Sequence, residues 1–326
     1  MSEAGFPTVS GVERALTTIR PHVAETPLVR AELLSRTLEA DVWLKNETVT
    51  EIASFKLRGA LNDLLAARKR GELRAVVAHS SGNHGRAVAY GARLLGLPAH
   101  VFISDKVSAT KARAIEAYGG IVHRAGADID HARFAAIAYA RSNGFHFVYD
   151  GESLDMMEGA GTMALEIAQG LPDIDALIVP MGGGNLSAGS AAVMAALQPG
   201  ARVIGVQPEV APVIATSFRE RRLVEVPPGE SVADGLVGRV PVEFTMRVLW
   251  RYLADAWLVD ERTILGAART LLECAHVLVE PSGAAALAAA WLQRRELAGK
   301  RIVLVLTSSN ASHAQIRQSL AAEPLF

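Results

Sequence analysis

The chain has 326 residues, of which 50% are hydrophobic and 21% are charged, and its 33 basic residues nearly balance its 34 acidic ones. This length and composition fit one large or two medium α/β domains and exclude a disordered or fibrous protein, and the formal net charge of −1 argues against nucleic acid as a partner. A single cysteine, Cys274, excludes an intrachain disulfide and a cysteine-based metal cluster.

The N-terminal residues contain neither a basic region nor an apolar region of the kind that forms a secretory signal. The longest apolar runs, such as residues 284–292, reach only about half the length that spans a bilayer. We therefore expect a soluble, cytoplasmic protein that does not bind membranes.

Along the first half of the chain, short apolar segments alternate with helical patterns. A capping box from Ser10 to Glu13 predicts a helix that ends at about Arg20. The elements that follow are helices at 31–39, 56–69, from 83, from 108 and from 130, and strands at 42–45, 75–79, 99–103, 121–124 and 145–149. The last four of these strands, separated by helices, imply a parallel sheet with right-handed crossovers.

The same alternation returns in the second half. The predicted helices lie at 157–169, after 185, at 245–253, at 263–276, from 283 and at the C-terminus, and the predicted strands at 176–179, 202–206 and 302–306. Residues 210–244 contain several prolines and glycines and are predicted to be irregular structure near a site. The pattern predicts two doubly wound α/β lobes with a cleft where the carboxyl ends of the strands meet.

A lone lysine begins one of the predicted helices. Lys56 lies beside an apolar face that recurs at the helical period. Burial at such a place disfavours the ammonium form, and an uncharged amine is a nucleophile toward aldehydes. By itself, a lysine followed closely by an arginine is more often a solvated side chain, so a chemical role depends on the rest of the chain.

The sharpest motif is a glycine-rich turn between a strand and a helix, which contains Gly182, Gly183, Gly184, Asn185 and Leu186. Backbone amides at such a turn converge on an anion, and the helix dipole adds its positive end, so a phosphate fits there. A Walker loop would need Gly-Lys-Ser/Thr after the glycines, which is missing. A dinucleotide fingerprint would need a further glycine where the chain has Ser187 and an acidic residue near Gln207. A smaller phosphorylated cofactor is the better match.

A second motif, His-Ser-Ser-Gly-Asn-His-Gly at 79–85, also joins a strand to a helix. Its amides and the hydroxyls of Ser80 and Ser81 can hold a carboxylate, and Asn83 can donate to a phenolate-like oxygen. The alternative is an ordinary capped helix.

A third group, Leu-Thr-Ser-Ser-Asn at 306–310, follows the last strand, and its three hydroxyls can hydrogen-bond a ring nitrogen without protonating it. The alternative is a polar turn that caps the final helix. A carboxylate, Glu280, precedes another predicted helix. Together, the amine, the phosphate turn, the carboxylate-binding turn and the neutral ring-nitrogen partner describe a site for a phosphorylated aromatic aldehyde and an amino acid.

On these motifs the sequence resembles the fold-type II pyridoxal-phosphate enzymes, specifically the threonine/serine dehydratase and serine racemase branch. The matching segments are SFKLRGA at 54–60, HSSGNHG at 79–85, GGGNL at 182–186 and VEPSGA at 279–284. The resemblance implies a tryptophan synthase β-like α/β fold, with residues 1–74 and 153–326 as a large cofactor-binding domain and 75–152 as a small domain that closes on substrate.

The resemblance also implies roles for individual residues. Lys56 would bond covalently to pyridoxal 5'-phosphate, and Ser81 matches the acid/base of racemases on the second face. The expected cofactor-binding residues are Phe55, Lys56, Asn83, Gly182, Gly183, Gly184, Asn185, Leu186, Glu280 and Thr307. The expected substrate-binding residues are Ser80, Ser81, Gly82, Asn83 and His84.

The chain departs from the family pattern at several places. The pair before the lysine motif is Ile52-Ala53 where a Thr-Gly pair is usual, and Asn185 replaces a fourth glycine. Where some members bind a divalent cation through acidic residues, this chain has Gln207 and Val213, so we predict that this metal site is absent. Residues 149–157 also differ, and because we expect them to face the substrate, its identity stays open.

Three functions remain. The first is an ammonia-lyase that converts a β-hydroxy-L-amino acid such as threonine or serine to a 2-oxo acid and ammonia, with Lys56 removing the Cα proton. The second is an amino-acid racemase in which Ser81 reprotonates the opposite face, and the third is a cofactor-binding protein without catalysis. With no room for an effector domain after the last helix, we expect a catabolic enzyme, and a homodimer is the default assembly.

Overall fold

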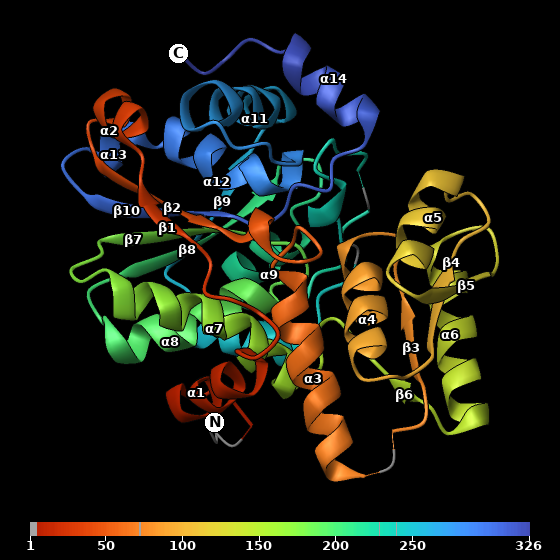
Figure 1. Ribbon diagram of the computed structural model, residues 1–326. Coiled ribbons are helices and arrows are strands. Elements are labelled where there is room, and N and C mark those ends of the chain that lie inside the picture. The colour runs from red at the N-terminus through yellow and green to blue at the C-terminus, as the bar shows by residue number, and fades with distance from the viewer. Residues whose placement is uncertain (1–4, 72, 228, 239) are drawn as a thin grey trace.

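The computed structural model describes residues 5–71, 73–227, 229–238 and 240–326, and its strands form two sheets (Figure 1). The larger sheet has the order β1-β2-β10-β7-β8-β9, and only β1 runs antiparallel to its neighbour. Its strands are β1 (Leu28–Arg30), β2 (Asp41–Asn46), β7 (Ala176–Pro180), β8 (Arg202–Pro208), β9 (Asp255–Val259) and β10 (Arg301–Leu306).

Helices cover both faces of the larger sheet. Along β10, Val303 and Val305 pack into one core while Ile302 and Leu304 pack into the other, because successive side chains of a strand point to opposite faces. The first core is closed by α1 (Val9–Ile19), α7 (Leu154–Gly170), α8 (Asn185–Leu197), α9 (Val213–Glu220) and α10 (Glu243–Tyr252). The helices on the other side are α2 (Glu32–Leu38), α11 (Glu261–Ala275), α12 (Pro281–Leu292), α13 (Arg294–Leu297) and α14 (His313–Ala321).

The smaller sheet has the order β5-β4-β3-β6, and all its strands are parallel. Its strands are β3 (Val76–His79), β4 (Ala99–Ile103), β5 (Gly120–Arg124) and β6 (His146–Phe147). Helices α3 (Lys56–Arg70), α4 (Asn83–Leu94) and α5 (Ala109–Ala117) lie toward one face and α6 (Ile129–Asn143) covers the other (Figure 1). This confirms the parallel sheet and the α/β class with two doubly wound lobes that the sequence predicted.

Several local expectations are corrected. The first helix begins at Val9, because the hydroxyl of Thr8 rather than Ser10 caps it by accepting from the Gly11 amide at 3.0 Å. The stretch 210–244, expected to be irregular, contains α9 and a 3-10 turn, η2 (Asp234–Leu236), although positions 228 and 239 lie outside the described residues. Strands β1 and β9 were not predicted, and β6 is shorter than expected.

A buried ionic network joins α3 to α7 and to the end of β2. The Arg58 side chain is fully buried and donates to Glu47 at 2.7 Å and to Glu166 at 2.8 Å. Lys45 donates to Glu166 at 2.7 Å, and the Thr26 hydroxyl donates to Glu47 at 2.6 Å. Buried charges persist only when they are paired and hydrogen-bonded. The network therefore fixes the helix that begins with Lys56.

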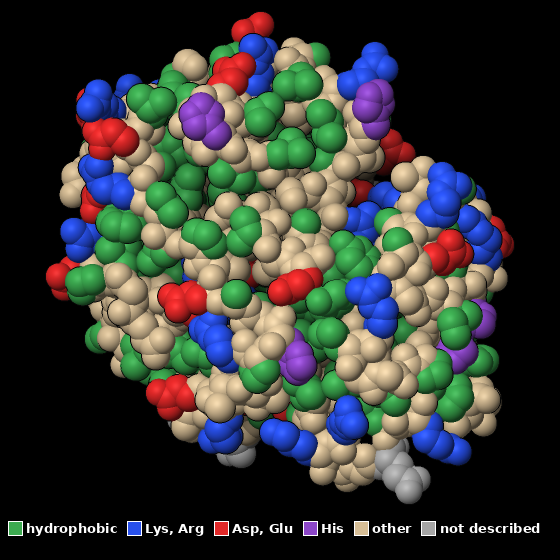
Figure 2. All heavy atoms as spheres, viewed as in Figure 1, with side chains coloured by type: hydrophobic (Ala, Val, Ile, Leu, Met, Phe, Trp, Pro, Cys, Tyr) green, Lys and Arg blue, Asp and Glu red, His purple; other side chains and the backbone are tan. Residues whose placement is uncertain are grey.

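The surface of the described residues combines both charges. Figure 2 shows acidic and basic side chains scattered over both lobes on the visible face, and the outline is indented between α14 and α5. Within the described residues, none of the helices combines the length and the apolar character needed to cross a membrane.

Candidate active site

The glycine turn lies where β7 ends and α8 begins, at the carboxyl end of the larger sheet. Gly184 has φ +94°, and a Cβ there would lie 2.8 Å from Thr245 Cγ2. A Cβ on Gly182 would lie 2.8 Å from the carbonyl oxygen of Gly235. The backbone therefore needs glycine at both positions, and it presents the free amides of a helix N-terminus.

Lys56 is the first residue of α3 and is tied to the end of β10. The Phe55 amide donates to the Thr307 carbonyl at 3.0 Å, and Ser54 forms a β-bridge with Ser308. The Lys56 ammonium lies 5.1 Å from the centre of the Phe55 ring. The lysine, the Phe55 ring and the buried Thr307 are thus brought together although they are far apart in the sequence.

Ala53 explains one departure of this chain from the family pattern. Its φ is +55°, a left-handed conformation that costs a residue with a Cβ roughly 1–2 kcal/mol. Its amide donates to the Thr50 carbonyl at 2.8 Å, and its carbonyl accepts from the Ser309 amide at 3.0 Å. Glycine suits such a position, and here alanine adopts the same turn.

Asp150 connects the lysine to the glycine turn. Its carboxylate accepts a hydrogen bond from the Lys56 ammonium and another from the Asn185 side chain at 3.4 Å. Burial acts to raise the pKa of this carboxyl, but the nearby positive charge, that of Lys56 first, together with the hydrogen bonds from Lys56 and Asn185 outweighs it and holds the pKa below its usual range. Sequence reasoning placed Asp150 in a segment facing the substrate but did not single out its carboxylate.

Asn83 comes from the lobe of the smaller sheet, and its side chain contacts residues in the lobe of the larger sheet. Its amide nitrogen donates to Glu280 at 2.8 Å, and its oxygen accepts from Asn310 at 2.8 Å. The Ser308 hydroxyl also donates to Glu280, at the start of α12. Burial raises the pKa of the Glu280 carboxyl. Ser308 and Asn310 lie in the polar group at 306–310, but their contacts with Glu280 and Asn83 were not predicted.

The residues in and next to the turn before α4 differ in their burial and in their hydrogen-bond partners. The Gly82 amide donates to the Ser80 hydroxyl at 3.1 Å, and Ser81 is half-buried. His84 is buried, and its Nε2 lies 3.1 Å from the Val148 carbonyl, so this nitrogen carries the proton. Burial lowers the pKa of the His84 imidazole. The neutral ring joins the turn to the segment before Asp150, and a substrate contact for His84 stays a prediction.

The surroundings of Leu186 and Gln207 limit what each residue can bind. The side chain of Leu186 lies in the core, so only its backbone amide is available to a ligand. The Gln207 side-chain oxygen accepts from the amides of Ile214 and Ala215, each at 2.9 Å, at the start of α9. An oxygen committed to two N–H donors is a poor ligand for a cation. The absence of a metal at this place remains a prediction.

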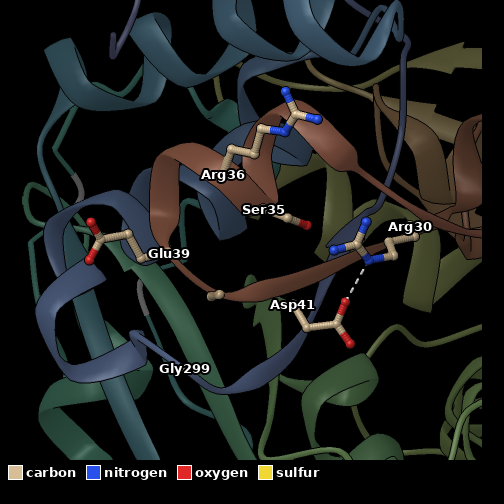
Figure 3. Close-up of a pocket in the computed structure, with 7 residues that line it drawn as sticks. Arg30, Ser35, Arg36, Glu39, Asp41 and Gly299 are labelled. Carbon is tan, nitrogen blue, oxygen red and sulfur yellow. Dashed lines mark hydrogen bonds and ion pairs between the residues drawn. The ribbon is translucent and has the colours of Figure 1, made fainter.

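A surface hollow lies at the opposite end of the larger sheet. Figure 3 shows it beside the first residue of β2, where the Arg30 guanidinium donates to Asp41 at 2.8 Å. Its lining residues are Arg30, Ser35, Arg36, Glu39, Ala40, Asp41 and Gly299. Ligands of parallel sheets bind at the carboxyl ends of the strands, whereas this hollow adjoins the amino ends of β2 and β10. We assign it no role in catalysis.

The residues at the carboxyl end fit pyridoxal phosphate. The Lys56 amine suits the aldehyde, and the glycine turn suits the phosphate. The Ser187 hydroxyl, in the first turn of α8, is buried without a hydrogen-bond partner among the described residues, as expected next to a site for a polar group.

Comparisons with known proteins point in the same direction. Residues 19–308 match the family model described as pyridoxal-phosphate dependent enzyme. The chain is 31% identical to the L-threo-3-hydroxyaspartate ammonia-lyase of Saccharomyces cerevisiae over 304 residues. These residues make up 93% of each chain. It is 35% identical over 301 residues to an L-threonine ammonia-lyase of Geobacter sulfurreducens, covering 92% of this chain and 74% of the other. The structure of maize serine racemase superposes with a TM-score of 0.90 at 29% identity, covering 96% of this chain and 97% of the other.

Proposed function

The chain belongs to the pyridoxal-phosphate-dependent enzymes, and from this premise we propose that it is an ammonia-lyase that converts a β-hydroxy-L-amino acid to a 2-oxo acid and ammonia. The cofactor is pyridoxal phosphate, and its use agrees with the family match. The observation that carries the proposal is the pairing of the Lys56 amine with Asp150, which in turn contacts Asn185 beside the glycine turn. The Asp150 side chain thereby links the Lys56 amine to a residue of the anion-binding turn.

Pyridoxal phosphate, when bound, supplies the electron sink that makes loss of the Cα proton feasible. The Lys56 nitrogen takes that proton from the substrate as a general base. The substrate then loses its β-hydroxyl as water, and hydrolysis of the product yields the 2-oxo acid and ammonia. The turn at 80–83 holds the substrate carboxylate through its amides and hydroxyls, which fixes Cα opposite Lys56.

Further roles complete the proposed site. The backbone amides of residues 182–186 would hold the phosphate, Asn83 the ring hydroxyl and Thr307 the ring nitrogen, while Glu280 would support Asn83. The 2.8 Å hydrogen bond between Asn83 and Glu280 supports this arrangement. We also propose that the enzyme is a cytoplasmic homodimer of amino-acid catabolism, to be checked by sedimentation and by fractionation of cells.

We propose that residues 75–152 form a small domain that closes over a large domain of residues 1–74 and 153–326. The hydrophobic cores of the larger sheet, which contain no residue of 75–152, support this division, and α3 of the large domain packs against the smaller sheet as the link between the two parts. A surface ion pair between Lys111 of α5 and Asp234 of η2, at 2.8 Å, lies where the two parts meet. Closure would exclude water from the reacting atoms.

A substrate screen tests the reaction directly. The cofactor-loaded protein is incubated with L-serine, L-threonine and L-threo-3-hydroxyaspartate, and the 2-oxo acid, ammonia and D-isomers are measured. We expect one ammonia for each oxo acid from at least one β-hydroxy amino acid, and no oxo acid from L-alanine, which lacks a leaving group. Failure of all β-hydroxy amino acids to release oxo acid would contradict the lyase function.

Racemisation is the second candidate function. The half-buried Ser81 and the similarity to maize serine racemase favour it. In the same screen, a D-isomer formed without oxo acid would identify a racemase. Replacing Ser81 by alanine would then remove D-isomer formation while sparing proton removal by Lys56.

The variant Gly184→Ala is expected to weaken binding of pyridoxal phosphate by about tenfold or more. Alanine resists the positive φ of this residue and its Cβ would collide with Thr245, so the turn must deform and its amides must leave their positions. The dissociation constant is measured from the visible absorption of the bound cofactor. Gly200→Ala is the control, because no atom lies within 4 Å of a Cβ there. Equal cofactor affinity in Gly184→Ala and wild type would contradict the assignment of the turn.

A further inference from the structure

Asp150 is held in place by both halves of the molecule. The carbonyl of its neighbour Gly151 accepts a hydrogen bond from the Thr245 hydroxyl of α10 at 2.7 Å, and Gly151 has φ +155°. On the other side, His84 of α4 donates to the Val148 carbonyl at 3.1 Å. The segment is thus anchored before and after the carboxylate, which has a fixed position in the site.

The charge of Asp150 is balanced chiefly by the lysine that performs the proposed chemistry. Its two oxygens contact the Lys56 ammonium and, at 3.4 Å, the Asn185 amide. When the Lys56 nitrogen is neutral and ready to accept the Cα proton, it no longer supplies a positive charge. The carboxylate then needs another donor, and a neighbouring negative charge becomes unfavourable.

The substrate side chain comes close to this carboxylate. For Lys56 to take the Cα proton, the Cα atom must approach its nitrogen to about 3–3.5 Å. Because an Asp150 oxygen contacts the same nitrogen, the substituent on Cβ then lies within about 9 Å of that oxygen. At that limit, with an effective dielectric constant of about 20, two like charges weaken binding by about twentyfold, and less where water penetrates.

We propose that Asp150 selects the substrate by charge: the enzyme accepts β-hydroxy amino acids whose side chains are uncharged or positively charged, and rejects those with a side-chain carboxylate. This inference rests on the proposed function, because it uses Lys56 as the base at Cα. It separates this chain from the relative named L-threo-3-hydroxyaspartate ammonia-lyase, with which it shares 31% identity. The contrasting possibility is that Asp150 only neutralises Lys56 and does not affect the choice of substrate.

The test compares two probes of nearly equal shape, L-asparagine and L-aspartate, which differ in side-chain charge and lack a β-hydroxyl. Their binding to the cofactor-loaded enzyme is followed by the change in the visible absorption band, which requires no turnover. We expect the wild type to bind L-asparagine at least about tenfold more tightly than L-aspartate. In Asp150→Asn this ratio should fall to about one, and in Asp150→Glu, which keeps the charge, the preference should remain.

Glu152→Gln is the matched control, because Glu152 is exposed in the same segment and its replacement also removes one negative charge. Its binding ratio should equal that of the wild type. In a kinetic assay, Asp150→Asn should raise kcat/KM for L-threo-3-hydroxyaspartate relative to L-serine by about tenfold or more. Because the comparison uses the ratio of kcat/KM for two substrates, any general loss of activity caused by the effect of the substitution on Lys56 cancels.

Several outcomes would overturn the inference. One is equal or undetectable binding of both probes by the wild type, and another is an unchanged ratio in a folded Asp150→Asn. If Asp150→Asn does not fold, the wild-type ratio and that of Asp150→Glu still decide. A preserved preference for L-asparagine in an enzyme that releases no oxo acid would count against the proposed lyase function and not against the role of Asp150.

Discussion

Lys56→Ala should lower turnover of every β-hydroxy amino acid by about 10³-fold or more. The change removes both the amine that bonds to the cofactor and the base that takes the Cα proton. The visible band of the loaded protein should also be lost, because it depends on the bond between the lysine and the cofactor. Initial rates of oxo-acid release and absorption spectra measure both effects.

The fold should survive this substitution. Lys56 lies in the first turn of α3 and its side chain is partly exposed, with 20% of its surface accessible, so alanine leaves no large cavity. Lys69→Ala, an exposed lysine in the last turn of the same helix, is the control and should keep full activity. Full turnover by a folded Lys56→Ala would remove both the lyase and the racemase function.

Arg58→Met should lower the free energy of unfolding by about 3–5 kcal/mol. Methionine fills much of the same space but leaves Glu47 without a positive partner among the described residues, while Glu166 keeps Lys45 and Arg20. An uncompensated buried charge is costly, whereas the intact network is satisfied. Urea unfolding followed by circular dichroism measures the change, provided that the transition is two-state.

The control for this prediction is Arg68→Met, on the exposed side of the same helix. Surface substitutions of this kind usually change stability by less than about 0.5 kcal/mol. A loss below about 1 kcal/mol in Arg58→Met would mean that the buried carboxylates find other partners or take up protons. The network would then not be the element that fixes α3.

The candidate site could be located from the sequence because its motifs are local. The glycine turn at 182–184 and the turn at 80–83 each lie at the junction of a strand and a helix, and strand ends of parallel sheets converge. Lys56 was found because it begins an amphipathic helix. Apolar periodicity also predicted that the face of α3 with Leu57, Leu61 and Leu64 is buried.

Asp150 and Arg58 show what sequence patterns did not reveal. Asp150 pairs with a lysine 94 residues away, and the nearest pattern is only a short turn after a strand. Arg58 was part of the reason for regarding Lys56, taken alone, as a solvated side chain. It is itself fully buried, because its partners Glu47 and Glu166 come from other elements of the fold. Charge pairing across a fold depends on tertiary contacts that one-dimensional periodicity does not contain.

Missed secondary structure has similar causes. β1 has only three residues, too few for an alternating pattern, and it forms by pairing with β2. α9 follows Pro212, in a stretch where the prolines and glycines favoured a loop. The first helix was misplaced because Thr8 and Ser10 are both good N-caps, and only the structure distinguishes them.

Covalent labelling tests the central claim most directly. The protein loaded with pyridoxal phosphate is treated with borohydride, which reduces the bond between lysine and cofactor to a stable one, and its peptides are analysed by mass spectrometry. The label should be found on Lys56. A label on another lysine, namely Lys45, Lys69, Lys106, Lys111 or Lys300, or a loaded protein with no label, would contradict the proposed site.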